Sequence, residues 1–482
     1  MVPAGTRTRG RGGLRHVFRR LVPFQRVRPE YGRQFRGRSW NGTCSRRRTR
    51  PGAAYGEDSI ALDGGYLFSF REDSIRFKPF VAWRPRPELA EQVAAPPYDV
   101  VTREEAVRLA RGNPQNFLHV ARSEIDLPPD LDPHDALVYA TAKANFDRLI
   151  ADGVLVHDAR PAVYLYEQVM EGRSQVGVVG CVHVDDYAAD VIRKHEKTRK
   201  DKEDDRTRHV LVLNANAEPV FLTFRDDPGL QRLITEGVRA ATLYDFTASD
   251  GVRHRVWPVE HPAAFVEAFA GVPVAYVADG HHRSASAWRA GAERRAANPA
   301  HHGDEEYNWF LGVLFPAERL RILPYHRVVR DLNGLSSGEV LERLRDIGRV
   351  VPAHEPDPPR PGSFGIYLEG RWHLLVLDAA TIPRDDPIRS LDAALLEERI
   401  LGPILGVGDI RADPRVDFVG GIRGTAELER RVQSGEMALA VAMHPVTVEQ
   451  LMAVADRGGI MPPKTTWFEP KLRSGLFVHT LD

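Results

Sequence analysis

The stretch Ala278–Ala285 places an aspartate, a glycine, two histidines and an arginine between two segments of different character. The apolar run Val272–Val277 before it predicts a strand, and the run Ser284–Ala290 after it predicts a helix. A strand that turns on Gly280 directly into a helix leaves the first helical N–H groups free. Those groups and the positive end of the helix dipole favour an anion. The stretch therefore predicts an anion-binding corner in a fold that combines strands and helices.

The side chains in this turn add chemistry that packing alone does not require. The backbone after Gly280 and the guanidinium of Arg283 would hold phosphate oxygens, with the guanidinium adding bidentate geometry. His281 or His282 would protonate a leaving oxygen, because histidine titrates near neutral pH. The alternative is a tight structural turn with Arg283 in a salt bridge. We predict a phosphate- or nucleotide-binding site made by Gly280, Arg283, Ser284, Arg206 and Lys464.

The segment from residue 191 to residue 205 is highly charged. Glu196 is its candidate general base, because a carboxylate that takes a proton from a hydroxyl suits phosphoryl transfer, where positioning and charge stabilisation dominate. Its cations would reach an anionic substrate from a mobile lid; they are Lys194, Lys197 and Arg199, with Arg206 just beyond. The alternative is a solvated, charged helix or loop without a catalytic role.

Carboxylates hold Mg²⁺ at nucleotide sites, so Asp205 and Asp279 are the predicted metal ligands. Zinc held by His195, His281, His282 and a nearby acid is a weaker alternative. Adjacent histidines lack the i, i+4 spacing that places two imidazoles on one helical face. Lys464, in the segment 461–468, would meet an anion, although an edge strand explains that segment nearly as well.

Strand-like and helix-like segments alternate along most of the chain, which predicts an α+β (mixed α/β) fold. Runs 162–169 and 176–184 predict a β-hairpin around Glu171–Ser174. Thr102 and Glu105 form the capping-box pattern of a helix start. Residues 134–150 have helical spacing, and the residues in the apolar rows are Leu137, Ala140, Ala144 and Leu149.

Four regions follow from these patterns. We expect an Arg-rich disordered tail over 1–70 and an N-terminal α/β segment over 71–160. A core over 161–335 carries the anion site, and a C-terminal α/β domain spans 336–482. The turn-rich stretch Pro356–Gly362 interrupts this last region.

Charge is distributed unevenly along the 482 residues, although the net charge is zero. Residues 1–50 contain 15 arginines and one acid, Glu30, so the rest of the chain carries 51 basic and 65 acidic residues, a net charge of −14. An acidic body is a poor binder of DNA, because phosphate contacts require surplus cations. The composition of the tail allows three interpretations. The tail is disordered, it is the product of an upstream start codon, or it contacts nucleic acid.

Two observations bear on the compartment. Cys44 and Cys181 are the only cysteines, which excludes a disulfide framework and a thiolate zinc site. No apolar run approaches the roughly 18–20 residues that cross a bilayer, and the Arg-rich start lacks the apolar segment of a signal peptide. We therefore expect a cytoplasmic protein with no membrane partner. Cys181 lies within an apolar β-run and is predicted to be buried.

From about Arg76 to its end the chain resembles the DUF1015 family of bacterial and archaeal proteins. The signatures that carry the resemblance occur in order along the chain. They are Ala94–Val100, His195–Thr198, Asp205–Arg206, Ala278–Arg283, Leu323–Arg327 and Met461–Phe468.

The turn Asp279–Arg283 is also similar to the phosphate-binding turn of the ParB/sulfiredoxin superfamily, which includes ParB nucleotidases, sulfiredoxin and a free-serine kinase. The resemblance implies a ParB/sulfiredoxin-like central core with additional α/β segments on either side. In the serine kinase a His-Glu pair supplies a catalytic carboxylate, which implies catalytic roles for His195 and Glu196. The turn lacks the cysteine of sulfiredoxin, and no basic helix-turn-helix region follows it.

These patterns and resemblances together predict a phosphotransferase or phosphatase acting on a small hydroxylated metabolite such as serine or phosphoserine. Glu196, His195, His281 and His282 are its predicted catalytic residues, and Mg²⁺ and ADP or ATP are its expected cofactors. The alternative is a ParB-like nucleotide-binding regulatory protein without metabolic turnover. A non-catalytic ligand sensor is a third interpretation.

Overall fold

The computed structural model describes residues 59–62, 66–69 and 74–482. The chain divides into two compact units, 1–47 and 48–482, of which the first lies outside the described residues. The predicted tail over 1–70 also lies outside them, except for one antiparallel pair of strands. That pair consists of β1 (Ser59–Leu62) and β2 (Tyr66–Ser69).

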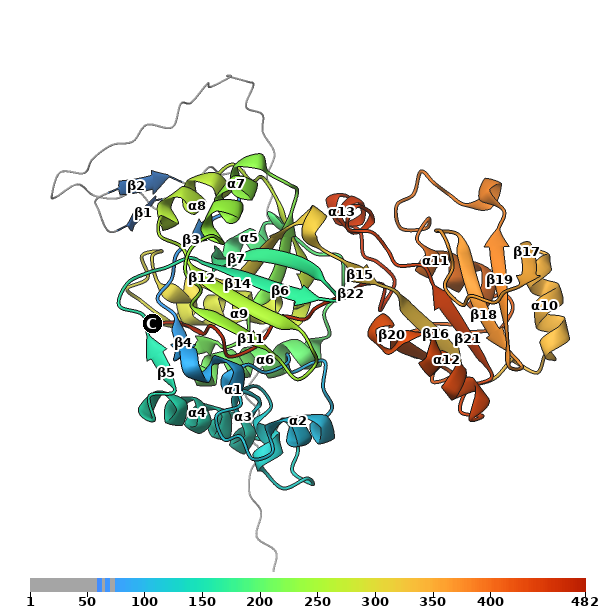
Figure 1. The fold of residues 1–482 in the computed structure, drawn as a ribbon, viewed down its shortest axis with the longest axis horizontal. Coiled ribbons are helices and arrows are strands. Elements are labelled where there is room, and N and C mark those ends of the chain that lie inside the picture. Colours follow the sequence, from blue (N-terminus) through green and yellow to red (C-terminus); the bar gives the residue numbers. More distant parts are fainter. Residues whose placement is uncertain (1–58, 63–65, 70–73) are drawn as a thin grey trace, which may run out of the picture. The chain divides into compact units, whose positions relative to one another are not determined.

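The first large element is a nine-stranded mixed sheet (Figure 1). Most neighbours are antiparallel, but β10 pairs with β14 and β13 pairs with β8 in parallel. In spatial order the strands are β11 (Tyr244–Thr247), β12 (Arg253–Pro258), β6 (Tyr164–Met170), β7 (Arg173–His183), β14 (Trp309–Pro316), β10 (Val220–Phe224), β13 (Ala275–Asp279) and β8 (Ile192–Arg193), with β3 (Phe77–Lys78) paired to β7.

Both faces of this sheet are buried. On β6, Tyr164 and Tyr166 pack into one hydrophobic cluster, while Leu165 packs into the other, as the alternation of side chains along a strand requires. The cluster that holds Leu165 is covered by α5 (Val184–Ala188), α7 (Pro228–Gly237), α8 (Pro262–Phe269) and α9 (His281–Ala297). The opposite cluster is covered by α13 (Val448–Asp456) and by residues 472–477. Cys181 lies inside this second cluster and is buried, as predicted.

The second large element is a six-stranded antiparallel sheet. Figure 1 shows α10 (Ser337–Arg345) and α12 (Gly424–Gln433) lying along it. In spatial order the strands are β17 (Gly348–Pro352), β19 (Arg371–Leu377), β18 (Ser363–Leu368), β21 (Leu439–Met443), β16 (Tyr325–Val329) and β20 (Val416–Gly420). Its core includes α11 (Asp392–Leu396) and the helical turn Glu397–Leu401 that follows.

A helical group forms the N-terminal segment, with α1 (Ala90–Val93), α2 (Arg103–Ala110), α3 (Leu118–Ala121), α4 (Ala136–Ala151) and the more distant α6 (Lys200–Leu213) around one cluster. The short antiparallel pair of β4 (Trp83–Pro85) and β5 (Leu155–His157) packs against the same cluster.

The end of the chain does not stay with the six-stranded sheet. β22 (Trp467–Phe468) pairs with β15 (Ile322–Leu323), and β23 (His479–Thr480) pairs with β9 (Ala215–Asn216). Ser474 also bridges to Ala95. The region predicted as one C-terminal domain, 336–482, therefore contributes its last residues to the elements around the nine-stranded sheet.

The observed α+β class confirms the predicted fold class, and the hairpin β6–β7 and the capping box of Thr102 and Glu105 are both present. The helix at 134–150 forms as α4. Of its predicted apolar rows, Leu149 is buried as expected, but Leu137, Ala140 and Ala144 are exposed. Leu137 is 49% exposed, whereas Val138, Tyr139, Ala142 and Phe146 are buried. This face packs against α6, which lies far away in sequence, and against α3 and the helical turn Ser123–Asp126. Among the described residues, no helix is both long and apolar enough to cross a membrane.

Candidate functional site

The corner between β13 and α9 has the predicted strand–glycine–helix geometry. Strand β13 ends at Asp279, Gly280 adopts φ 94°, and α9 begins at His281. No side chain caps the start of α9. The N–H groups of the first turn of a 17-residue helix are therefore free of side-chain caps at this corner.

Gly280 occupies the left-handed backbone region, which strains any residue with a Cβ atom. A Cβ here would also lie 3.0 Å from Nε of Arg283. We expect Gly280→Ala to lower the free energy of unfolding by about 1–2 kcal/mol, measured by urea denaturation. The control is Gly408→Ala, at a glycine outside the left-handed region whose Cβ would meet nothing within 4 Å. Equal losses in the two variants would contradict a strained corner.

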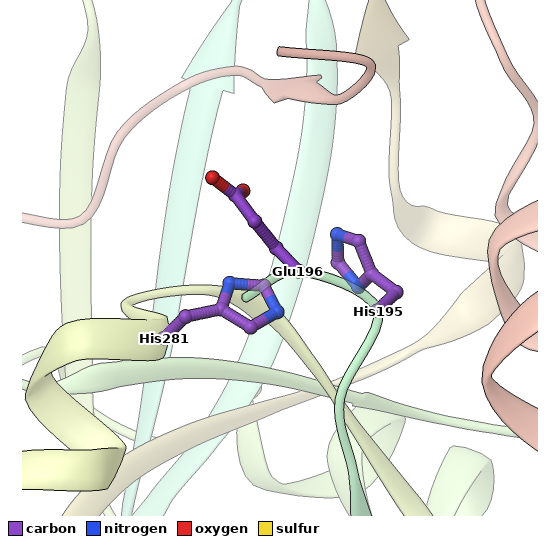
Figure 2. A group of neighbouring side chains, drawn as sticks. All are labelled: His195, Glu196 and His281. Atoms are coloured by element: carbon purple, nitrogen blue, oxygen red, sulfur yellow. The ribbon is translucent and has the colours of Figure 1, made fainter. Parts of the chain in front are cut away.

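His195, Glu196 and His281 meet at this corner (Figure 2). One ligand atom from each side chain lies within 4.8 Å of the others. The two imidazole rings stand edge to face, with centroids 4.5 Å apart. The sheet explains the meeting: β8 and β13 are parallel neighbours, so the residues that follow their carboxyl ends emerge at the same edge.

Both imidazoles of this cluster are neutral near pH 7. Burial lowers the pKa of His195 well below the ordinary histidine value, and the neighbouring His281 lowers it further. Burial also lowers the pKa of His281 to about 4, against the opposing charge of Asp279. A neutral imidazole accepts a proton or binds a metal, but it is a poor proton donor. The predicted acid role of His281 therefore does not fit its surroundings.

His282 holds the loop that carries Glu196. Its Nε2 accepts a hydrogen bond from the backbone N–H of Arg199 at 3.1 Å. Burial lowers the pKa of His282 as well. The first two histidines of α9 thus have different tasks: His281 faces His195 and Glu196, and His282 positions the loop.

Arg283 and Ser284 differ from their predicted roles. The guanidinium of Arg283 donates to the carbonyl of Pro219 at 2.5 Å and to Asp279 at 3.0 Å, and its side chain is only 6% exposed. The hydroxyl of Ser284 donates back into the turn, to the carbonyls of Gly280 and His281. The hydrogen bonds of both side chains hold the corner together, although Nε of Arg283 is buried without a partner among residues 74–482.

The two predicted Mg²⁺ ligands are already neutralised by cations. Asp205 accepts from Arg206 at 2.8 Å and from the Tyr139 hydroxyl at 2.7 Å, and its pKa is lowered to about 2 by these partners despite burial. Asp279 pairs with Arg283 and lies 3.5 Å from Nζ of Lys471. Carboxylates paired in this way do not fit a dedicated Mg²⁺ site.

A cavity of about 830 Å³ opens beside the corner. Eight of the eleven predicted site residues line it; the three that do not are His195, Arg283 and Ser284. Four lining cations have no ion-pair partner within residues 74–482. These cations are Lys197, Lys202, Arg411 and Lys464. The cavity therefore has positive charge available for an anionic ligand.

Other lining residues come from parts of the chain that sequence reasoning did not assign to a site. Tyr98 and Asp99 line the cavity, and the guanidinium of Arg206 lies over the Tyr98 ring, 4.2 Å from its centroid. The backbone of Tyr98 is held by Glu218, which is buried. Phe418 and Lys471 reach the cavity from distant segments, and nothing local in the sequence marks them.

Comparison with known proteins adds a family and a set of structural likenesses. The family described as "Protein of unknown function (DUF1015)" matches residues 77–394. A conserved hypothetical protein from Pyrococcus furiosus is similar at 14% identity and a TM-score of 0.32, over 62% of this chain and 94% of that one. A free serine kinase in complex with AMP is similar at 14% identity and a TM-score of 0.33, over 63% and 90%. No curated protein matches the sequence significantly.

Proposed function

The chain belongs to the DUF1015 family, and we propose that it is a phosphotransferase or phosphatase acting on a small hydroxylated metabolite. One observation carries the proposal: the free start of α9 and the carboxylate of Glu196 are at the same cavity, which also holds unpaired cations. The volume of about 830 Å³ lies within the range of small-molecule sites.

The anion-binding part of the proposal rests on charge and backbone geometry. Phosphate oxygens would accept from the N–H groups of His281 and His282, which no side chain caps. Lys464 and Arg411 line the cavity and would add positive charge. Arg283 stabilises the corner through its hydrogen bonds to Pro219 and Asp279, and we do not assign it to the phosphate.

The proton-transfer part rests on Glu196. Its side chain lines the cavity beside the imidazoles of His195 and His281, and among residues 74–482 no cation lies within ion-pair distance of its carboxylate. A carboxylate in this position accepts the proton of a hydroxyl or of water while phosphate is held at the start of α9. Serine or phosphoserine is the proposed substrate, with ADP or ATP as the phosphate donor. Mg²⁺ would enter with the nucleotide phosphates, because it commonly binds through them and through water.

The test is a product assay with the full chain. Purified protein is incubated with Mg²⁺, serine and either ATP or ADP, and separately with phosphoserine alone. We expect phosphoserine in the first mixtures or free phosphate in the last, each detected by mass spectrometry or phosphate release. Nucleotide binding without any product would favour the ParB-like regulatory alternative. The absence of both nucleotide binding and product formation would overturn the proposal.

A further inference from the structure

We infer that His195, Glu196 and His281 form a binding site for a divalent transition-metal ion of the Zn²⁺ type. Their ligand atoms lie within 4.8 Å of one another. Zinc bonds of about 2.0–2.2 Å place tetrahedral ligand atoms roughly 3.4 Å apart. To close around an ion, the ligand atoms would therefore have to approach one another by up to roughly 1.4 Å.

The imidazole of His281 gives an independent reason for a ligand here. The residue is only 6% exposed, and its Nε2 has no hydrogen-bond partner among residues 74–482. A buried polar nitrogen without a partner is unusual and costly. A metal ion in the cluster would satisfy this nitrogen, which the hydrogen bonds of the corner leave unused.

His195 is oriented for the same task. It is 1% exposed, and one ring nitrogen, Nε2, lies 3.3 Å from the hydroxyl of Thr466. Metal-binding histidines are commonly oriented in this way by an outer partner on the ring. From the sequence alone, a zinc site is disfavoured because His281 and His282 are adjacent. The structure removes that objection, since the second imidazole comes from a different loop.

The donor set discriminates between metals. Two imidazole nitrogens and one carboxylate suit Zn²⁺ and related transition ions, whereas Mg²⁺ prefers an all-oxygen shell. Three protein ligands also leave a position open, as in catalytic zinc sites. Glu196 and His281 both line the cavity, so that open position is accessible to an oxygen of a ligand in it. An ion bound there would polarise a phosphate or hydroxyl oxygen.

This inference does not rest on the proposed function, because metal binding is measured without a substrate. Tag-free full-length protein is stripped with a chelator and titrated with Zn²⁺ by calorimetry and with Co²⁺ by visible absorption. We expect one ion per chain, and we expect the visible absorption bands to be those of a Co²⁺ ion with a low coordination number. Glu196→Gln and His281→Gln should each weaken Zn²⁺ binding by at least about tenfold, as the loss of a residue around a bound metal ion commonly does.

The control is His302→Ala, which removes an exposed histidine that lies 3.7 Å from Glu305, outside the cluster. Its Zn²⁺ affinity should equal that of the wild type. Absence of stoichiometric binding to the wild type would overturn the inference, and so would unchanged binding in both cluster variants. If His281→Gln does not fold by circular dichroism, Glu196→Gln decides alone, because Glu196 is partly exposed. Zinc binding without phosphoryl transfer would keep this inference and remove the proposed function.

Discussion

Glu196→Gln is expected to lower kcat by about 10²–10⁴-fold, the usual contribution of a general base. The glutamine keeps the size and the hydrogen-bonding ability of the side chain but cannot accept a proton. KM for the phosphorylated substrate should change little, because the phosphate is assigned to the start of α9 and to lining cations. The measurement is steady-state kinetics of product formation on the substrate pair that the product assay identifies.

Asp204→Asn provides the matched control for this variant. Asp204 lies in the same charged region, on α6, where it pairs with Lys200 and Arg289, and it does not line the cavity. Removal of this negative charge should leave kcat within about twofold, because screened surface pairs contribute little. Full activity in Glu196→Gln would remove the assigned base. Equal losses in both variants would indicate a general electrostatic effect of the region instead.

His281→Gln separates the two tasks proposed for this cluster. It keeps the carboxylate of Glu196 but removes one of the two imidazoles. A variant that loses Zn²⁺ binding and keeps turnover would show that Glu196 acts without an ion. Loss of both would connect the ion to the reaction.

Local features of the site could be predicted because they depend on neighbouring residues. The turn on Gly280, the strand before it and the helix after it follow from side-chain type and order. The capping box of Thr102 and Glu105 is local in the same sense, since both its hydrogen bonds join residues three apart. Leu149 of α4 is buried as predicted, whereas Ala140 and Ala144 were mispredicted because a small alanine fits an exposed row as well as a buried one.

The partners of each site residue could not be predicted, because they come from other parts of the chain. Arg283 was expected to meet phosphate, but the carbonyl of Pro219, 64 residues earlier, occupies its guanidinium. The pairing of β8 with β13 brings Glu196 to His281 across 85 positions, and no local pattern specifies that pairing. Asp205 appeared free for a metal until its contacts with Tyr139 and Arg206 were known.

Arg283→Met is expected to lower the free energy of unfolding by about 3 kcal/mol, near the lower end for breaking a buried ion pair. The methionine fills similar space but leaves the carbonyl of Pro219 without its donor and removes the main partner of Asp279. The loss stays near the lower end because Asp279 is partly exposed and keeps Lys471 at 3.5 Å. Urea denaturation followed by circular dichroism measures the difference.

Arg289→Met is the matched control, because Arg289 lies on the same helix but pairs with Glu203 and Asp204 nearer the surface. Its loss should stay below about 1 kcal/mol. A second measurement separates support from ligand binding: a bound phosphate ligand stabilises the folded state by mass action. If Arg283 only supports the corner, saturating ligand should stabilise Arg283→Met by the same increment as the wild type. If Arg283→Met instead loses little stability and the ligand no longer stabilises it, Arg283 binds phosphate, as the sequence predicts.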